Sequence, residues 1–497
     1  MQQAVGKIVD GFEGLEVTPP DITAQDSMSS IADKVNDAFG DAAPAVEDFE
    51  DITSADSMSE VADKVDGNFA KLEEDMSNGT FTFLHTSDPH GYTRNNTGGV
   101  QQMVSMMDNP NGYNYRFGCI SGDLKAYTGS TRKPSIYDSI LKGCTGMQGG
   151  KLIVIGGNHD ECDSWTSDDS DTENAALYAQ ARSTAWLKSL LGSSAIGNKV
   201  NWGDTDGITN EPITSAYYYQ DFIVGTKKVR VICMDQYDTD ACINEYNTAH
   251  STSYVRRKSW TSGSHYRTAY SQAQVDWFIS LLMQTDSSYR VIIVTHDGVA
   301  LQTPTVYANG EYNTEALFFT SDAADYSVNG GSWIPKVVHA WMNKTSINTT
   351  YTSSVPYNNG SDGELSYTVN VVADFTSVDT GKLICYLAGH THYDYSYWCN
   401  KTNYPGQLQL IITAATSNVA YTEHDDLLTE MTSFTQVVPS EPSYRVNRVT
   451  YDIEAHTVLV ERIGQQTAAL KTDASKTRVR DRLLFDLDTM EVTHPNS

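Results

Sequence analysis

Five short segments between residues 88 and 392 carry side chains of the types that bind divalent metals. In chain order they are Asp88-Pro89-His90, Gly122-Asp123, Gly157-Asn158-His159-Asp160, His296 and Gly389-His390-Thr391-His392. Each segment follows an apolar run that is typical of a buried β-strand. In an α/β scaffold the loops after strand ends bring distant residues together. Their order, spacing and shared strand-end position therefore predict one site that is assembled from all five segments.

The residue types indicate the chemistry of this site. Carboxylate, imidazole and amide oxygen suit borderline divalent metals such as Mn, Fe, Zn, Ni or Co, and the set contains no thiolate. Two such cations held about 3.5–4 Å apart can bind one phosphate, activate a water and stabilise the attacking and leaving oxygens. Such a pair needs a bridging carboxylate, and Asp123 is the candidate for that position.

The five segments resemble the signature blocks of the calcineurin-like metallophosphoesterases. The blocks occur in the family order: D-x-H, G-D, G-N-H-D, a lone His after a strand, and G-H-x-H. A softer match, residues 271–278 (SQAQVDWF), is similar to the S-x-x-Q-x-x-W-L helix that often precedes the fourth block. The similarity covers roughly residues 79 to 465. One departure is Lys125, because many members carry an acidic or small residue close after the G-D pair.

This resemblance implies a ligand set and an activity. One metal would be held by Asp88, His90, Asp123 and His392. The other would be held by Asp123, Asn158, His296 and His390. His159 would not be a ligand but would donate a hydrogen bond or proton to the leaving oxygen of the substrate, with Asp160 as its partner. The implied activity is the metal-dependent hydrolysis of a phosphoester, either a diester or a monoester.

Each of these residues also has a structural interpretation when it is taken alone. A lone histidine such as His296 is more often a satisfied structural residue than a ligand, and the Gly389–His392 segment could be a strand-end turn. The joint occurrence of the blocks favours the metal site. His85 and the other histidines outside the blocks are expected to have structural or surface roles. Cysteines in core-like strands are expected to be small buried hydrophobes, and these are Cys119, Cys233 and Cys385.

The apolar runs predict an α/β fold. Strands are expected from Phe81 and over residues 115–120, 151–155, 229–234, 290–295, 382–387, 407–413 and 448–453. Helices are expected between several of them, at residues 175–191 and 272–283. This alternation indicates α/β layering. The family resemblance refines the expectation to a four-layer arrangement, in which two mixed β-sheets pack face to face with helices outside.

A tandem repeat precedes the first strand. The segment that starts at Asp21 (DITAQDSMS) returns at Asp51 (DITSADSMS). The two repeats span about residues 21–40 and 51–72, and each runs into an amphipathic helical pattern. In the second copy Ser57 and Glu60 form a plausible capping box. Helices this short are marginal alone and need a partner surface. The expected domains are a helical arm at 1–78, the catalytic domain at 79–465 and a C-terminal extension at 466–497.

The arm admits two interpretations. It could form a helical hairpin packed on its own catalytic domain, or it could serve as a docking or oligomerisation arm. Its repeats resemble the short repeated helices at the N-termini of tailed-phage structural proteins, which attach a functional domain to the virion. The expected partners are therefore a phosphoester substrate and, through residues 1–78, a second copy of the chain or virion structural proteins. A structural or adhesion component of a virion with little turnover is the alternative function.

Composition bounds the remaining possibilities. The formal net charge of −29 disfavours nonspecific nucleic-acid binding, which depends on Lys and Arg. No basic-then-apolar leader and no run of about 20 apolar residues occurs, so neither a signal peptide nor a membrane span is expected. The expected location is the cytoplasm of the producing cell or a virion, as part of a phage tail. Seven cysteines are an odd number without framework spacing, so disulfides are not implied.

Two polar inserts and the C-terminus complete the sequence expectations. Residues 236–270 and 303–370 are rich in small polar residues and Tyr, and they are expected to be walls of a substrate cleft or irregular surface. Residues 478–487 (RVRDRLLFDL) are expected to be either a last edge strand or a contact with another subunit.

Overall fold

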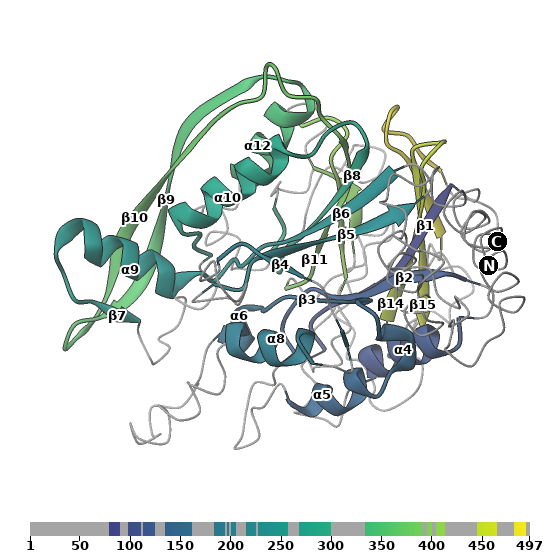
Figure 1. Cartoon of the computed structure of the whole chain (residues 1–497), viewed down its shortest axis with the longest axis horizontal. Coiled ribbons are helices and arrows are strands. Elements are labelled where there is room, and N and C mark those ends of the chain that lie inside the picture. Colours follow the sequence, from purple (N-terminus) through teal and green to yellow (C-terminus); the bar gives the residue numbers. More distant parts are fainter. Residues whose placement is uncertain are drawn as a thin grey trace, which may run out of the picture. The chain divides into compact units, whose positions relative to one another are not determined.

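The computed structural model describes residues 79–89, 98–110, 113–124, 135–161, 183–193, 196–197, 200–204, 215–224, 227–256, 268–299, 333–390, 395–399, 404–412, 445–464 and 482–493. Two compact units are distinguished along the chain, one with residues 1–80 and 221–229, the other with residues 81–220 and 230–497. The predicted N-terminal arm, residues 1–78, lies outside the described residues. Figure 1 labels the helices and strands that follow.

The first sheet has seven strands and mixed direction. Its strand order is β17 (Val492–Thr493), β16 (Arg482–Asp486), β15 (Thr457–Gly464), β14 (Arg445–Asp452), β1 (Thr80–Thr86), β2 (Tyr115–Ile120) and β3 (Leu152–Val154). β1, β2 and β3 run parallel, whereas β14 to β17 pair antiparallel. Strand β16 confirms the strand interpretation of the C-terminal segment, because it pairs with β15 in this sheet, although β17 and not β16 lies at the edge.

The second sheet also has seven strands and mixed direction. Its strand order is β12 (Tyr395–Trp398), β13 (Leu408–Ile411), β11 (Lys382–Ala388), β8 (Tyr289–Val294), β6 (Lys227–Cys233), β5 (Tyr218–Val224) and β4 (Asn201–Trp202). β8, β11 and β13 run parallel, while β12 and β4 pair antiparallel with their neighbours. The parallel strands in the middle read as continuous apolar runs, as strands buried on both faces do.

A third sheet lies in the segments predicted to be polar inserts. Strands β9 (Ser346–Asn358) and β10 (Asp362–Asp374) form a long antiparallel hairpin, and β7 (Val255–Arg256) pairs with the end of β9. The hairpin arches over helices α10 and α12 in Figure 1. Much of the two inserts is therefore regular structure. The described helical elements are α4 (Gly98–Asp108), α5 (Ser135–Lys142), η1 (Thr145–Met147), α6 (Asn158–Glu161), α8 (Ser183–Leu191), α9 (Thr239–His250), α10 (Gln272–Met283) and α12 (Trp333–Met342).

Helix α10 shows what the residues of the SQAQVDWF segment do in the structure. Its N-cap Ser271 accepts a hydrogen bond from the Gln274 backbone N–H, which satisfies one of the free donors of the first turn. The Gln274 side chain then donates to the Asp235 carbonyl and accepts from the Asp235 N–H, at 2.9 Å each. Ser271 and Gln274 thus tie the start of α10 to the loop that follows β6.

The fold class is mixed α/β, as predicted. The strands predicted from apolar runs are present, with ends that shift by a few residues, and α10 has the predicted bounds. The core between α10, α12 and the hairpin contains Phe278, Trp333 and Trp341, all fully buried. Within the described part of the chain, no helix is long and apolar enough to cross a membrane. Cys119, Cys233 and Cys385 are buried and free, as expected.

Candidate metal centre

The described site residues all follow strand ends closely. Asp88 follows β1, Asp123 follows β2 and Asn158 follows β3, and these three strands are parallel neighbours. His296 follows β8 and His390 follows β11, which are parallel neighbours in the second sheet. Because the carboxyl ends of parallel neighbours lie at one edge of a sheet, each group of loops is brought together by the strand order.

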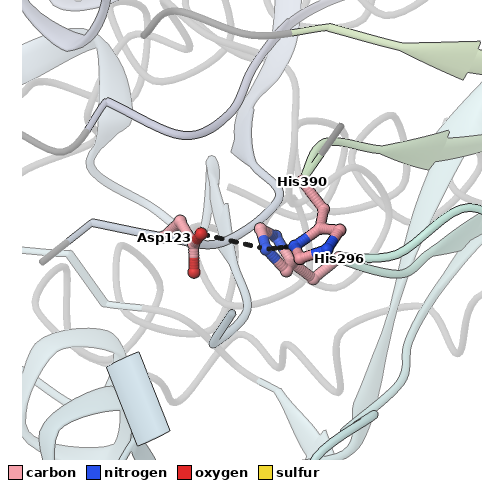
Figure 2. Close-up of side chains that lie close together, drawn as sticks. All are labelled: Asp123, His296 and His390. Carbon is pink, nitrogen blue, oxygen red and sulfur yellow. Dashed lines mark hydrogen bonds and ion pairs between the residues drawn. The ribbon is translucent and has the colours of Figure 1, made fainter. Parts of the chain in front are cut away.

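Three of these side chains form a compact trio. Ligand atoms of Asp123, His296 and His390 all lie within 4.8 Å of one another. His296 Nε2 is 3.2 Å from Asp123 Oδ2 and 3.3 Å from His390 Nδ1. Figure 2 shows the three side chains arriving from separate elements and pointing toward one another. Side chains from three distant segments thus present oxygen and nitrogen atoms to one small volume, and the trio is a possible metal-binding group.

The tautomer of His296 is fixed by its environment. His296 Nδ1 is 2.7 Å from the Ser121 carbonyl oxygen. A carbonyl can only accept, so Nδ1 carries the proton and donates it. In the neutral ring, Nε2 therefore holds a lone pair, and this lone pair faces Asp123 and Asn158. A backbone carbonyl that orients a ring so that its other nitrogen is free is the usual arrangement behind a metal-binding histidine.

Asn158 adds a fourth donor to the trio. Its Oδ1 is 3.0 Å from His296 Nε2 and 2.9 Å from His390 Nδ1. With the oxygen inward, the amide presents an acceptor to one nitrogen of each ring. With the amide turned over, its nitrogen would donate to His296, His390 and Asp123. Both orientations converge on the same point, and the inward oxygen is the one that suits a cation.

Asp88 joins the first and fifth segments. Both of its carboxylate oxygens accept from the His390 backbone N–H, at 3.0 and 2.8 Å. The Asp88 N–H in turn donates to the Gly122 carbonyl at 3.0 Å. Asp88 is fully buried. Its carboxylate is therefore placed between the Gly122-Asp123 segment and the Gly389-His390 segment, as a ligand near a shared carboxylate would be.

Backbone strain is concentrated at these positions. Asp88, Asp123 and His390 all have positive φ, at 50°, 54° and 65°. Residues other than glycine adopt this left-handed conformation uncommonly, and each instance costs of order 1–3 kcal/mol. Two members of the trio, Asp123 and His390, share this conformation with Asp88, which bonds to the His390 backbone. Strain of this kind persists at sites where function fixes the geometry.

Glycines next to the ligands are required by close packing. A Cβ at Gly157 would collide with the Asp123 carboxylate and backbone. A Cβ at Gly389 would collide with Ser87 Oγ and with Asp88 Oδ2. The glycines of the G-N-H-D and G-H-x-H segments thus leave room for the carboxylates of the other segments. Their presence follows from the assembled site and not from turn geometry alone.

Negative charge dominates the electrostatics of the centre. Burial by itself would lower the pKa of His296, but the nearby carboxylates of Asp123 and Asp88 outweigh it and raise the pKa to about 10. The next residue, Asp297, has a pKa raised to about 7, first by burial, while the charge of His296 and a hydrogen bond from Tyr237 oppose the rise. The centre, in which Asp123 and His296 are buried and His390 is partly buried, therefore holds positive charge strongly, here as a proton on His296.

The remaining predicted residues are placed only in part. His90 and His392 lie outside the described residues, as does the side chain of His159, whose backbone is in α6. Asp160 is buried, and its Oδ2 accepts from the backbone N–H of Gly157 at 2.8 Å and of Leu124 at 3.2 Å. These two bonds fasten the Asn158 segment to the Asp123 segment. The role of Asp160 beside His159 stays a prediction.

Asp297 was not predicted as a site residue. Its Oδ1 is 3.3 Å from His390 Nδ1, and its Oδ2 accepts from the Tyr237 hydroxyl at 2.8 Å. The only sequence signal was its position, directly after His296 at a strand end. His85, outside the five segments, is buried with Nε2 2.9 Å from Ser121 Oγ, and so supports the loop that orients His296.

Comparison of the sequence with models of known families finds no match, and comparison with curated proteins finds none either. The functional assignment therefore depends on the residues and on the geometry of the centre.

Proposed function

We propose that this chain is a metal-dependent phosphoesterase that uses a dinuclear metal centre. The observation that carries the proposal is the convergence of Asp123, Asn158, His296 and His390 on one small volume, with the ring of His296 oriented by the Ser121 carbonyl. Carboxylate, amide oxygen and imidazole without thiolate are the donors that suit Mn, Fe, Zn, Ni or Co. This donor set fits a divalent cation, as the segment pattern predicts.

The proposed ligand assignment is the one that the resemblance to the calcineurin-like metallophosphoesterases implies. One cation would be held by Asp123, Asn158, His296 and His390. The second would be held by Asp88 and Asp123 together with His90 and His392. Two cations at such a centre bind one phosphate, acidify a water and stabilise the attacking and leaving oxygens. Asp123 would be shared between them, which is supported by its place beside both His296 and the loop that carries Asp88.

The other residues would orient the ligands and protonate the leaving oxygen. The Ser121 carbonyl keeps His296 in one tautomer, and Asp160 fastens the two loops that carry Asp123 and Asn158. His159 would donate a proton to the leaving oxygen, a contribution worth typically about 10²–10⁴-fold in rate. Its neighbours support this assignment, because Asn158 and Asp160 on either side are both buried at the centre.

The fold of the larger unit supports the proposal. The Tyr218 hydroxyl of the second sheet donates to the Val154 carbonyl of the first sheet at 2.8 Å, and the Val154 N–H donates back to it at 3.0 Å. Arg290 of β8 donates to the Tyr451 hydroxyl of β14 at 3.1 Å. Contacts of this kind between two mixed sheets are what the face-to-face arrangement of the calcineurin-like metallophosphoesterases requires, and we propose that four-layer arrangement for this chain.

Hydrolysis of a chromogenic aryl phosphodiester tests the proposed activity. The purified chain should hydrolyse it with added Mn²⁺ and lose activity in a chelator. Asp123→Asn should remove most of the activity, because it takes a negative charge from the ligand shared by both cations. Groups that merely orient ligands already contribute about 10–100-fold, so the expected loss is larger. Activity that survives both chelation and Asp123→Asn would exclude a two-metal mechanism.

The N-terminal repeats support a second part of the proposal. Two copies of one short amphipathic helical pattern suit attachment to a larger assembly such as a phage tail, and a virion component with little turnover remains the alternative function. A chain that starts near Asn78 should keep its phosphoesterase activity but lose self-association or attachment, measured by light scattering beside the full-length chain. An insoluble or inactive shortened chain would place the repeats within the catalytic domain instead.

A further inference from the structure

Asp297 is held on nearly all sides by neighbours that are not metal ligands. Its backbone N–H donates to Gln236 Oε1 at 2.6 Å, and its carbonyl accepts from Gln236 Nε2 at 3.2 Å. The same carbonyl accepts from Thr295 Oγ1 at 2.8 Å. The Tyr237 hydroxyl donates to Oδ2 at 2.8 Å. These four bonds fix the backbone of Asp297 and one of its two carboxylate oxygens.

The second carboxylate oxygen differs from all of these groups. Among the described residues, Asp297 Oδ1 has no hydrogen-bond donor, although the side chain is only 2% exposed. It lies 3.3 Å from His390 Nδ1, on the side of the centre that also carries His296. A buried carboxylate oxygen without a donor is costly, because it has lost water and gained no partner. Such an atom persists where a positive charge satisfies it.

We infer that Asp297 is a further anionic member of the metal centre, which strengthens cation binding on the side of His296 and His390. This inference depends on the proposed metal centre. Asp297 lies beside the trio of Asp123, His296 and His390 and is not one of its three mutually close members. Its role is to add negative charge next to the His390 ligand atom. Tyr237 positions it by holding Oδ2, so that Oδ1 faces His390.

The local arrangement also explains why the surrounding residues are of these types. Gln236 can hold both backbone groups of Asp297 because its side chain carries both a donor and an acceptor. Tyr237 is 5% exposed, and its hydroxyl donates a hydrogen bond to Asp297. Burial, followed by the charge of Asp297, raises the pKa of Tyr237 well above its ordinary value, so the hydroxyl remains a donor. Two consecutive residues of the loop after β6 thus support one carboxylate after β8.

Metal titration separates this role from a structural one. Full-length chain, stripped with a chelator, would be titrated with Mn²⁺ by calorimetry as wild type, Asp297→Asn and Tyr237→Phe. The buried Asp238→Asn serves as the matched control. Asp297→Asn should raise the Kd of one Mn²⁺ equivalent by about 10–100-fold, the range typical of groups around a metal's ligands. Tyr237→Phe should raise it less, because the charge stays and only its orientation is loosened. Asp238→Asn should leave both Kd values unchanged.

Two results would overturn the inference. Asp297→Asn could bind Mn²⁺ with the wild-type Kd, or Asp238→Asn could weaken binding as much as Asp297→Asn does. If the Kd of Asp297→Asn is unchanged and the melting temperature of the chelator-treated variant is lower, then Asp297 is structural. Failure of the wild-type chain to bind Mn²⁺ is a distinguishable result, since it would overturn the proposed centre and with it this inference.

Discussion

Asp238 and Asp297 are two buried carboxylates that follow neighbouring strands of one sheet. Asp238 comes after β6 and Asp297 after β8, and they are 2% and 1% exposed. Burial raises the pKa of both, to about 7 for Asp297 and well above the ordinary value for Asp238. Neither burial nor the direction of the pKa shift distinguishes the two residues, although both properties are often used to find functional sites.

Their hydrogen-bond partners do distinguish them. Asp238 Oδ1 accepts from Ser215 Oγ at 2.5 Å, and Oδ2 accepts from Ser271 Oγ and, at 3.2 Å, from Gln274 Nε2. Both oxygens of Asp238 are therefore satisfied by neutral donors from its own surroundings. Asp297 has one satisfied oxygen and one that faces a histidine of the centre. We interpret the carboxylate with complete donors as structural, and the carboxylate with an oxygen toward His390 as part of the proposed metal centre.

The largest expected effect tests whether the residues beside Asp297 bind a metal. His296→Ala should raise the Kd of the metal by more than about 100-fold, because it removes a proposed ligand. Residues that only orient the ligands contribute up to about 100-fold. Phosphoesterase activity should fall with the metal affinity. The matched control is His456→Ala, a buried histidine that contacts Lys382 and Asp488 instead of the centre. Metal content after gel filtration measures both variants. Retention of both metal equivalents by His296→Ala, or equal losses in the two variants, would contradict the assignment.

The structural role of Asp238 predicts an effect of intermediate size, on stability and not on metal binding. Asp238→Asn should lower the free energy of unfolding by about 1–3 kcal/mol, because the amide nitrogen cannot accept from the donors that now face an oxygen. Urea denaturation in chelator measures this loss. Ser215→Ala removes one donor and leaves the carboxylate, so it should cost less. If Asp238→Asn is as stable as the wild type, or if it weakens metal binding, then the two aspartates are not of different kinds.

Sequence patterns located the residues that converge in the structure better than the residues that support them. Strand ends and glycines pointed to Asp123, Asn158, His296 and His390, because a metal site needs particular residue types at particular strand ends. Asp297 was not predicted, because a single Asp after a His forms no recognisable motif. Its partners Gln236 and Tyr237 lie 61 and 60 residues away in the chain, so only the fold brings them together.

The polar hairpin shows the other limit of sequence reasoning. In β10 the buried Leu365, Tyr367 and Val369 alternate with exposed polar residues, a pattern that could have identified a half-buried strand. Strand β9 has hydroxyl residues on both faces, as at Thr349 and Thr352, so its strand character follows from its pairing with β10 alone. Tertiary pairing here overrides a composition that is typical of loops.

The smallest expected effect concerns protons released when a metal binds. With a pKa of about 10, His296 is protonated at neutral pH in the absence of a cation, and its Nε2 proton faces Asp123 Oδ2 at 3.2 Å. A cation must replace that proton, so affinity should fall by about tenfold for each pH unit of acidification below this pKa. The sign follows because lower pH favours the protonated ring, which cannot ligate. Calorimetry of Mn²⁺ binding at pH 7, in two buffers of different ionisation enthalpy, should count at least one proton released per chain. Asp297→Asn should release fewer protons than wild type, because a carboxyl with a pKa of about 7 is partly protonated at that pH and should lose its proton to the buffer when a cation binds nearby. Equal proton counts for the two chains would mean that Asp297 does not sense the cation, and would place it with Asp238 among the structural carboxylates.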